Sequence, residues 1–257
     1  MSGAAPALAA ADLYAVAAAG TGAIAGLVAA VSGFGIGSLL TPVIALHADT
    51  RVAIVAVSVP HLAGTALRFW SMRRSIDRRI MFQFGMTSAV GGLAGALTHG
   101  ALNSRRLTIV FGLLLLLTAI AELTGWMRRV HWGRSFGWLA GALSGFLGGL
   151  VGNQGSVRTA GLLAYRVSPT AFVATATAIA LIVDAARMPV YLVTQGGEIA
   201  ALWPTVALAT TGVVAGTVIG IRILPKLRTK TFRRTVAILL AVLGVAMLAS
   251  AFRVMSG

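Results

Sequence analysis

Two glycine-rich segments interrupt otherwise apolar stretches at matching places in the two halves of this chain. They are Ser32–Ser38, with three glycines, and Gly152–Ser156, with two. Inside a bilayer every backbone N–H and C=O must find a partner, so a broken helix survives at membrane depth only where protein or a water-filled cavity surrounds it. Paired breaks therefore indicate two repeats with a binding site near the membrane midplane.

The composition of the chain indicates an integral membrane protein. Of its 257 residues, 58% are hydrophobic and only 11% are charged, and its mean hydropathy is +0.90, unlike a water-soluble domain. A helix needs about 20 apolar residues to cross the hydrocarbon core of a bilayer. The chain contains eight apolar runs of about this length, which predict an all-α bundle of about eight spans. These runs are 12–31, 52–71, 80–100, 106–125, 135–151, 169–194, 203–222 and 235–252, and shorter helices near 38–47 and 157–165 follow the two breaks.

The net charge of +15 indicates topology, because the positive residues lie in short loops between the apolar runs. Nucleic acid is therefore not expected as a partner. Residues 1–11 have no basic segment, and we expect a short tail there, not a signal peptide. Three basic clusters are predicted to be cytoplasmic: Arg73, Arg74, Arg78 and Arg79; Arg128, Arg129 and Arg134; and Lys226, Arg228, Lys230, Arg233 and Arg234.

Placing the basic clusters on one side of the membrane determines the course of the chain. Segments 12–31 and 38–47 then form a hairpin that opens to the exterior, and segments 135–151 and 157–165 form one that opens to the cytoplasm. Three spans follow each hairpin, so the halves have opposite orientation, as in secondary transporters that work by alternating access. We therefore expect a tail at 1–11, inverted repeats at 12–125 and 135–257, and a cytoplasmic linker at 126–134.

Other glycines are interpreted according to their neighbours. Gly33 and Arg68 recur about 119 positions later as Gly152 and Arg187, which supports the repeat. Glycine patterns without polar neighbours are predicted to let helices pack closely, since small residues bring backbones together. These patterns are Gly91-Gly92-x-x-Gly95, Gly141-x-x-x-Gly145 and Gly212-x-x-x-Gly216-x-x-x-Gly220.

Both breaks resemble signatures of a known family. The run Gly33-Phe34-Gly35-Ile36-Gly37-Ser38-Leu39-Leu40-Thr41-Pro42 resembles the glycine-rich, proline-terminated signature of the TauE/SafE sulfite exporter family. The segment 145–156 is similar to that family's second signature, although Asn153 and Gln154 replace glycines and Ala160 stands where a proline is usual. The resemblance covers most of the chain. It implies a multi-pass transporter of the bacterial inner membrane that moves small sulfur-containing or organic anions, such as sulfite, sulfoacetate and related sulfonates, without ATP.

Residues at the two breaks are suited to an anion of this kind. Arg158 follows the second break without an acidic neighbour in sequence, and a charge inside a bilayer needs a partner or a purpose; the alternative is that it snorkels to headgroups at the cytoplasmic edge. The short helices after the breaks would present backbone N–H groups to an anion, and a guanidinium binds two oxygens at once. The predicted substrate-binding residues are Gly35, Gly37, Ser38, Asn153, Gln154, Gly155, Ser156, Arg158 and Arg187.

Three further residues at membrane depth are charged or titratable, and one of them, Asp184, lies close to Arg187 in the sequence. Asp184 and Arg187 are three positions apart on one helix, which predicts an ion pair. Asp184 is also a candidate for proton coupling, if it takes up a proton as the anion binds Arg187. Arg68 lies close to the basic cluster that begins at Arg73, and we expect it to snorkel. His61 is interpreted as a packing residue.

These features favour a secondary carrier of a small anion. An anion channel with the same lining is an alternative. A membrane-embedded enzyme is a weaker one, because it would need a serine with a histidine, or paired aspartates, at membrane depth. Both breaks lack carboxylates and histidines and the chain has no cysteine, which argues against a metal transporter. No cofactor or metal is expected; the expected partners are a small anionic substrate and the lipid bilayer, and a homodimer is left open.

Overall fold

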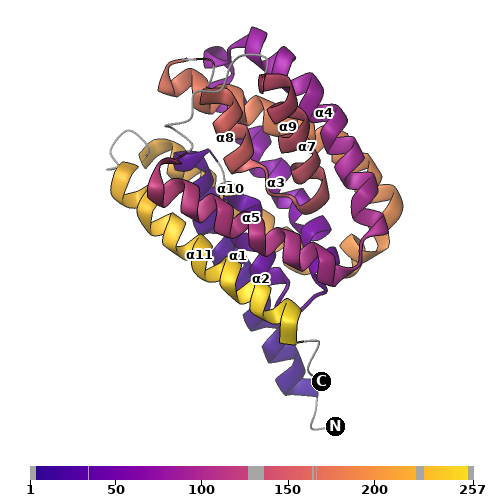
Figure 1. Cartoon of the computed structure of the whole chain (residues 1–257). Helices are drawn as coiled ribbons and strands as arrows, with labels where there is room; N and C mark the ends of the chain where they lie inside the picture. Colours follow the sequence, from indigo (N-terminus) through magenta and orange to yellow (C-terminus); the bar gives the residue numbers. More distant parts are fainter. Residues whose placement is uncertain are drawn as a thin grey trace.

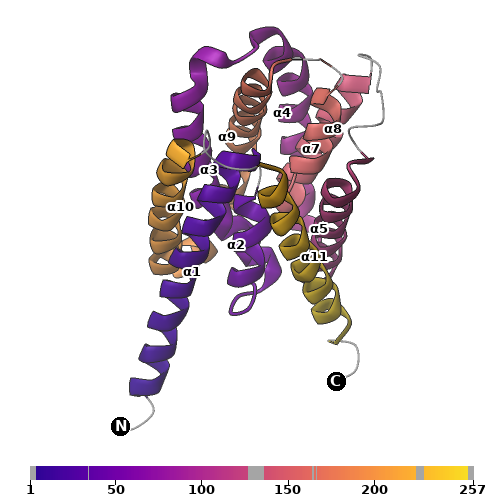
Figure 2. The same ribbon diagram turned by 90° about the vertical axis from the view of Figure 1, so that its left-hand side faces the viewer.

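A computed structural model shows a bundle of helices (Figures 1 and 2) and describes residues 4–33, 35–126, 136–163, 165, 167–223 and 229–253. The linker predicted at 126–134, apart from Trp126, and the basic residues Lys226 and Arg228 lie outside these ranges. Within them the elements are α1 (Ala4–Ser32), α2 (Ile36–Ile44), α3 (Thr50–Met72), the 3-10 turn η1 (Arg73–Ser75), α4 (Arg78–Ala101), α5 (Ser104–Thr124), α7 (Phe136–Val151), α8 (Gly155–Leu163), α9 (Pro169–Ala201), α10 (Trp203–Ile223) and α11 (Thr229–Arg253).

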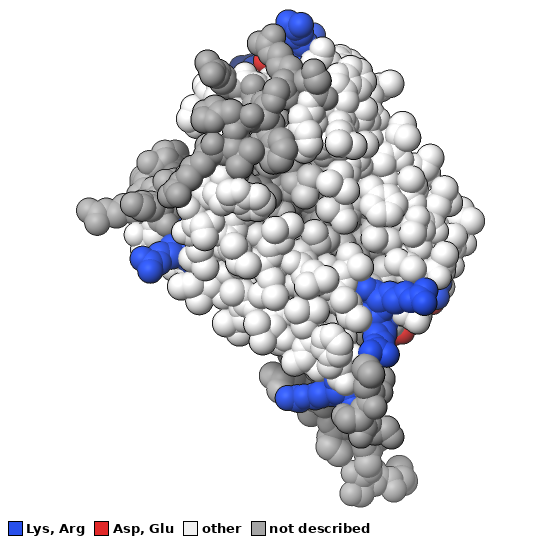
Figure 3. Space-filling view, in the orientation of Figure 1, with Lys and Arg blue, Asp and Glu red and all other residues white. Residues whose placement is uncertain are grey.

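Seven of the described helices are long and apolar enough to cross a membrane. The remaining predicted run, 135–151, corresponds to α7, which has 16 residues and forms a hairpin with α8. Figure 3 shows a broad surface of uncharged residues, with the visible charged side chains at its edges: at the top, at the left and toward the lower right. The chain is therefore a multi-pass helical membrane protein.

Helix α1 begins earlier than the sequence analysis expected. It starts at Ala4, so most of the segment 1–11, interpreted as a tail, is helical. The segment contains mainly alanine, the strongest helix former, and its only proline, Pro6, lies in the first helical turn, where proline is tolerated. The hydrophobic span that begins near Tyr14 therefore continues a helix that has already formed.

The two broken hairpins open toward opposite ends of the bundle. Helix α1 rises from the end that carries both termini and α2 turns back toward it, whereas α7 and α8 form a hairpin that opens at the other end (Figures 1 and 2). The tips of the hairpins touch, because a Cβ atom built on Gly37 would lie 2.5 Å from the carbonyl oxygen of Gly152. The breaks in the two halves therefore meet at one place inside the protein.

Helix packing follows the same pattern in both halves. Helix α1 packs along α10 and α7 packs along α4, while α3 packs on α9 and α5 on α11. The predicted close-packing glycines lie at these contacts: a Cβ atom would lie 1.8 Å from the oxygen of Ala23 at Gly216, and 2.0 Å from the oxygen of Ser88 at Gly145. The packing interpretation of these glycines is confirmed. The reciprocal pattern supports the predicted inverted repeat.

Candidate functional site

Glycine permits the chain reversal at both breaks. Gly33, Gly35 and Gly152 have φ angles of 82°, 133° and 72°, values that residues with a Cβ atom rarely adopt. Helix α2 starts directly after Gly35, and α8 starts at Gly155. Each break thus ends one helix and begins a short one at the depth where the hairpin tips touch.

A polar cavity lies between the two tips. Its volume is only ≈ 10 Å³, close to the least that holds one water molecule, so the cavity is constricted in this conformation. Residues from both breaks, from α3 and from α8 form the wall. They are Gly33, Gly35, Gly37, Ser38, His61, Arg68, Gly152, Asn153, Gln154, Gly155 and Arg158.

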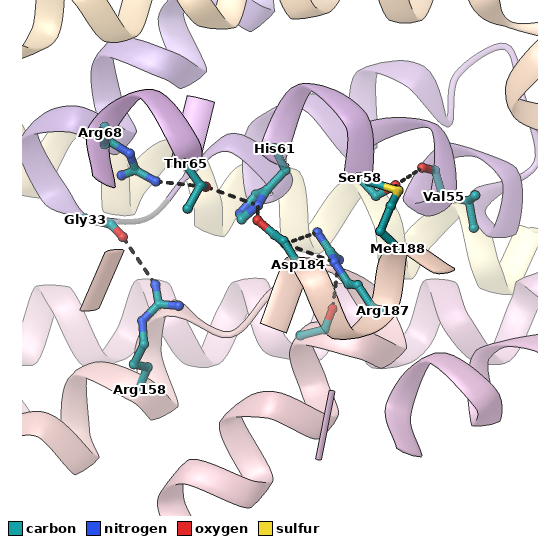
Figure 4. A network of polar contacts seen from close by, with 11 residues as sticks. Gly33, Val55, Ser58, His61, Thr65, Arg68, Arg158, Asp184, Arg187 and Met188 are labelled. Carbon is teal, nitrogen blue, oxygen red and sulfur yellow. Dashed lines mark hydrogen bonds and ion pairs between the residues drawn. The ribbon is translucent and has the colours of Figure 1, made fainter. Parts of the chain in front are cut away.

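Two buried arginines line this cavity, one from each half of the chain. Arg158 is 4% exposed and Arg68 is 2% exposed, so neither side chain snorkels to lipid headgroups. The expectation for Arg68 was wrong because the side chain turns into the protein, where it donates to the carbonyl oxygen of Ala29. Arg158 donates to the carbonyl oxygen of Gly33, 3.3 Å away. Figure 4 shows both guanidinium groups on the two sides of Gly33.

Several polar atoms of the cavity wall have no hydrogen-bond partner among the described residues. Three are donors: Nε of Arg68, Nδ2 of Asn153 and Nη1 of Arg158. The fourth is Oε1 of Gln154, an acceptor. A buried donor without a partner costs about 1–3 kcal/mol, and native proteins keep few of them. The wall therefore has a surplus of N–H groups suited to the oxygens of a bound molecule.

Asp184 is held by two cationic or titratable groups beside the cavity. Its Oδ1 accepts from Nε of Arg187 at 3.1 Å and lies 2.8 Å from Nη2 of the same residue, so the predicted ion pair is confirmed. Its Oδ2 lies 2.7 Å from Nδ1 of His61. His61 belongs to the first half of the chain and lines the cavity. His61 is buried and hydrogen-bonded, as expected of a satisfied packing residue, but its partner is the carboxylate of the other half and it also lines the cavity (Figure 4).

The broken C-terminal end of α7 is satisfied by side chains from other helices. The carbonyl oxygens of a final helical turn lack the N–H partners that a longer helix would supply, although that of Gly148 also accepts from the N–H of Gly152 at 3.0 Å. Here the oxygen of Gly148 accepts from Nη1 of Arg187 at 2.8 Å, that of Gly149 accepts from the hydroxyl of Tyr191, and that of Leu150 is 2.8 Å from Nδ1 of His99. Three consecutive carbonyls are thus bound, which holds the tip of the second hairpin in place.

The structure brings most of the predicted site residues to one cavity and gives two of them other partners. Ser156 receives a hydrogen bond from Thr118 at 3.1 Å, and Arg187 binds Asp184 and Gly148; neither lines the cavity. Sequence reasoning missed His61 and Arg68 as wall residues. The recurrence of Arg68 as Arg187, already visible in the sequence, was the signal that could have identified Arg68.

A second set of buried polar groups lies along α9, toward the end of the bundle opposite η1. Gln195 is 3% exposed, and its amide lies beside the imidazole of His99. The backbone of Gln195 is not helical, with φ −142° and ψ 21°, so α9 is kinked there. Asp184, Arg187, Tyr191 and Gln195 repeat every three or four residues and therefore share one face of the helix.

The described residues contain no group of three or more histidine, cysteine, aspartate or glutamate side chains that could hold a metal ion.

Comparison with known proteins gave one match. The model of the family described as sulfite exporter TauE/SafE matches residues 18–247, which includes both hairpins, the cavity and the Asp184 network. No curated protein and no solved structure matched the chain.

Proposed function

Because the chain belongs to the sulfite exporter TauE/SafE family, a family of membrane transporters, we propose that it is a secondary transporter of a small anion bearing a sulfite or sulfonate group. The proposed membrane is the bacterial inner membrane, with the basic clusters on the cytoplasmic side. The proposed binding site is the cavity between Arg68 and Arg158. Its unpartnered N–H donors are the observation on which this proposal mainly depends.

The charge balance around the cavity favours an anion. Arg68 and Arg187 occupy equivalent positions in the two halves, and each donates to a group three residues earlier. For Arg187 that group is the carboxylate of Asp184, whereas for Arg68 it is the neutral hydroxyl of Thr65, at 3.3 Å. The described residues that line the cavity include two guanidinium groups and no carboxylate. A bound oxyanion would offset a charge that the protein itself leaves uncompensated.

The donors of the wall are suited to the oxygens of a sulfite or sulfonate group. A guanidinium presents planar N–H groups that bind two oxygens at once, and charge-assisted hydrogen bonds are stronger than neutral ones. Asn153 and Ser38 add neutral donors from the two breaks. We infer that the anion is held between Arg68 and Arg158, and that Arg187 acts as a structural residue, which revises the substrate role expected from the sequence.

Alternating access follows if the two repeats move relative to each other around this site. Arg68 belongs to the first repeat, 12–125, and Arg158 to the second, 135–257, so an anion between them bridges the two moving parts. Without the anion, two like charges face a constricted cavity, which disfavours closure. Binding would stabilise the closed state, as expected for a carrier with inverted repeats. The reciprocal packing of the halves supports this mechanism.

Proton coupling is proposed to act through His61 and Asp184 together. Asp184 does not line the cavity, but His61 lines it and contacts Oδ2 of Asp184. Nδ1 of the neutral imidazole donates to the carboxylate, so a proton that reaches the ring from the cavity would bind Nε2, and the carboxylate would stabilise the charge of the resulting imidazolium. The added positive charge would lie beside the anion and increase its affinity.

The test is uptake of labelled sulfite and labelled sulfoacetate into proteoliposomes that contain the purified chain, with and without an imposed pH gradient. We expect saturable uptake, faster when the vesicles are preloaded with unlabelled anion, because a carrier exchanges its substrate. Arg158→Ala should abolish the uptake and Arg158→Lys should weaken it, since lysine lacks the planar fork. Arg105→Ala removes the same charge at an exposed position of α5 and is the matched control.

Three outcomes would contradict parts of the proposal. Absence of flux for both anions would remove the assigned substrate. Unchanged uptake by Arg158→Ala, with the control also unchanged, would remove the assigned site. Flux that neither saturates nor responds to preloading would indicate the channel alternative.

A further inference from the structure

A second cavity lies where α3 meets α4, at the end of the bundle that carries η1. Its empty volume is ≈ 770 Å³, counting the open side. The wall consists of Phe69, Arg73, Arg74, Ile76, Arg78 and Met81. It shares no residue with the cavity between the hairpin tips, although Phe69 follows Arg68 directly in the chain. The two cavities are therefore separate sites.

This wall divides into a basic part and an apolar part. Arg73, Arg74 and Arg78 are exposed, whereas Phe69 and Met81 are half-buried. The described residues of the wall include no carboxylate. The nearest one in sequence, Asp77, is engaged as the N-cap of α4, where its Oδ1 accepts from the backbone N–H of Ile80 at 3.0 Å. Three positive charges thus face an open cavity that has an apolar floor.

The position of the cavity relative to the membrane is marked by Trp70. Its ring is 65% exposed, and tryptophan is enriched at the boundary between hydrocarbon and headgroups. The guanidinium carbon of Arg73 lies 4.0 Å from the centre of this ring, and its Nη1 donates to the carbonyl oxygen of Trp70 at 2.7 Å. Arg73 therefore packs on a tryptophan at the end of a helix that is long and apolar enough to cross a membrane, which places it at headgroup level.

We propose that this cavity binds the headgroup of an anionic phospholipid. The phosphate oxygens would bind Arg74 and Arg78, with Arg73 at the rim, because guanidinium groups bind phosphate in a bidentate geometry. The glycerol backbone and the first acyl carbons would lie on Phe69 and Met81. A free phosphate ion would satisfy the same arginines but leave the apolar floor uncovered, so the lipid is the better complement. The site does not depend on the transport function proposed above.

The test is native mass spectrometry of the full detergent-solubilised chain, titrated with phosphatidylglycerol or with phosphatidylcholine. We expect preferential retention of phosphatidylglycerol. The double variant Arg74→Gln/Arg78→Gln should weaken that binding by about thirtyfold, since each basic residue near an anionic lipid surface contributes about 1 kcal/mol and 1.4 kcal/mol is tenfold. The matched control is Arg105→Gln/Arg106→Gln, which removes two exposed arginines at the opposite end of the bundle.

The same experiment contains the results that would overturn the proposal. An equal loss in the control variant would show that phosphatidylglycerol responds to overall charge and not to the cavity. Displacement of phosphatidylglycerol by millimolar inorganic phosphate would assign the cavity to a free anion. Unchanged phosphatidylglycerol binding by Arg74→Gln/Arg78→Gln would exclude the cavity as the site. Anion uptake should persist in this variant, so a failure here is separable from a failure of the transport proposal.

Discussion

Arg68 and Arg187 make equivalent contacts in the two halves of the protein. Each donates to a carbonyl oxygen 39 positions earlier, that of Ala29 and that of Gly148, in the last turns of the broken helices α1 and α7. Both carbonyls also accept from the backbone N–H of the glycine at the break, Gly33 or Gly152, so each arginine adds a second hydrogen bond at the end of the broken helix in its own half. They differ in charge balance, because Arg187 is paired with Asp184, whereas Arg68 contacts the neutral Thr65.

Replacing Thr65 by aspartate should strongly weaken the binding of the proposed substrate anion. The new carboxylate would occupy the position that Asp184 occupies in the other half and would neutralise Arg68. The anion would then lose one charge-assisted hydrogen bond, worth about 2 kcal/mol, or about thirtyfold in affinity. Isothermal titration with sulfite measures the effect. Asparagine has the shape of aspartate without its charge, so Thr65→Asn should retain most of the affinity for sulfite. Equal losses of affinity in both variants would indicate a steric effect instead.

Replacing His61 by glutamine should remove the pH dependence of uptake while leaving uptake itself. The amide N–H₂ can still donate to Asp184 Oδ2, so the contact survives, but the side chain no longer binds a proton. Initial rates of uptake at fixed substrate concentration, measured with and without a pH gradient, report the change. His47→Gln is the control because His47 is exposed and stacks on Tyr14 far from the cavity wall. A gradient response that persists in His61→Gln would rule out His61 as the coupling group.

Replacing Gly149 by alanine should destabilise the contact between α4 and α7. The added Cβ atom would lie 1.9 Å from the carbonyl oxygen of Gly92, and a backbone atom cannot move aside cheaply. Overpacking of this kind typically costs 1–3 kcal/mol, which should lower the thermal unfolding temperature of the solubilised protein by several degrees. Gly197→Ala, where nothing lies within 4 Å of the new atom, should leave the unfolding temperature unchanged.

Gln195 should become accessible to water from the side opposite the basic clusters during transport. Its buried amide and the kink in α9 mark the polar face of α9 that leads away from Asp184. The chain has no cysteine, so Gln195→Cys provides a single thiol for a membrane-impermeant reagent. We expect labelling from that side, slowed by substrate. Ile179→Cys, at a fully buried apolar position of the same helix, should stay unlabelled; equal rates at both positions would contradict the assignment of this face.

The sequence predicted the class of fold from local patterns, and it placed a candidate site at the two glycine-rich breaks. Apolar runs, basic clusters and glycine-rich breaks act through the bilayer and the backbone, whose constraints apply to any chain. The same reasoning located Arg158 and the polar residues of the second break, and it identified the pair of Asp184 and Arg187, because helical spacing alone brings those two together. Close packing at Gly145 and Gly216 was also predictable, because small residues repeated at helical spacing let neighbouring helices approach.

Only the tertiary structure decided which charges face the cavity. Arg68 was expected at the membrane surface from its distance to Arg73, yet the side chain direction depends on the carbonyl of Ala29, which α1 supplies from 39 positions away. His61 reaches Asp184 across 123 positions, a contact that no periodicity within α3 encodes. Such long-range partners are set by how helices pack, and the energy of a buried charge depends on them more than on its neighbours in sequence.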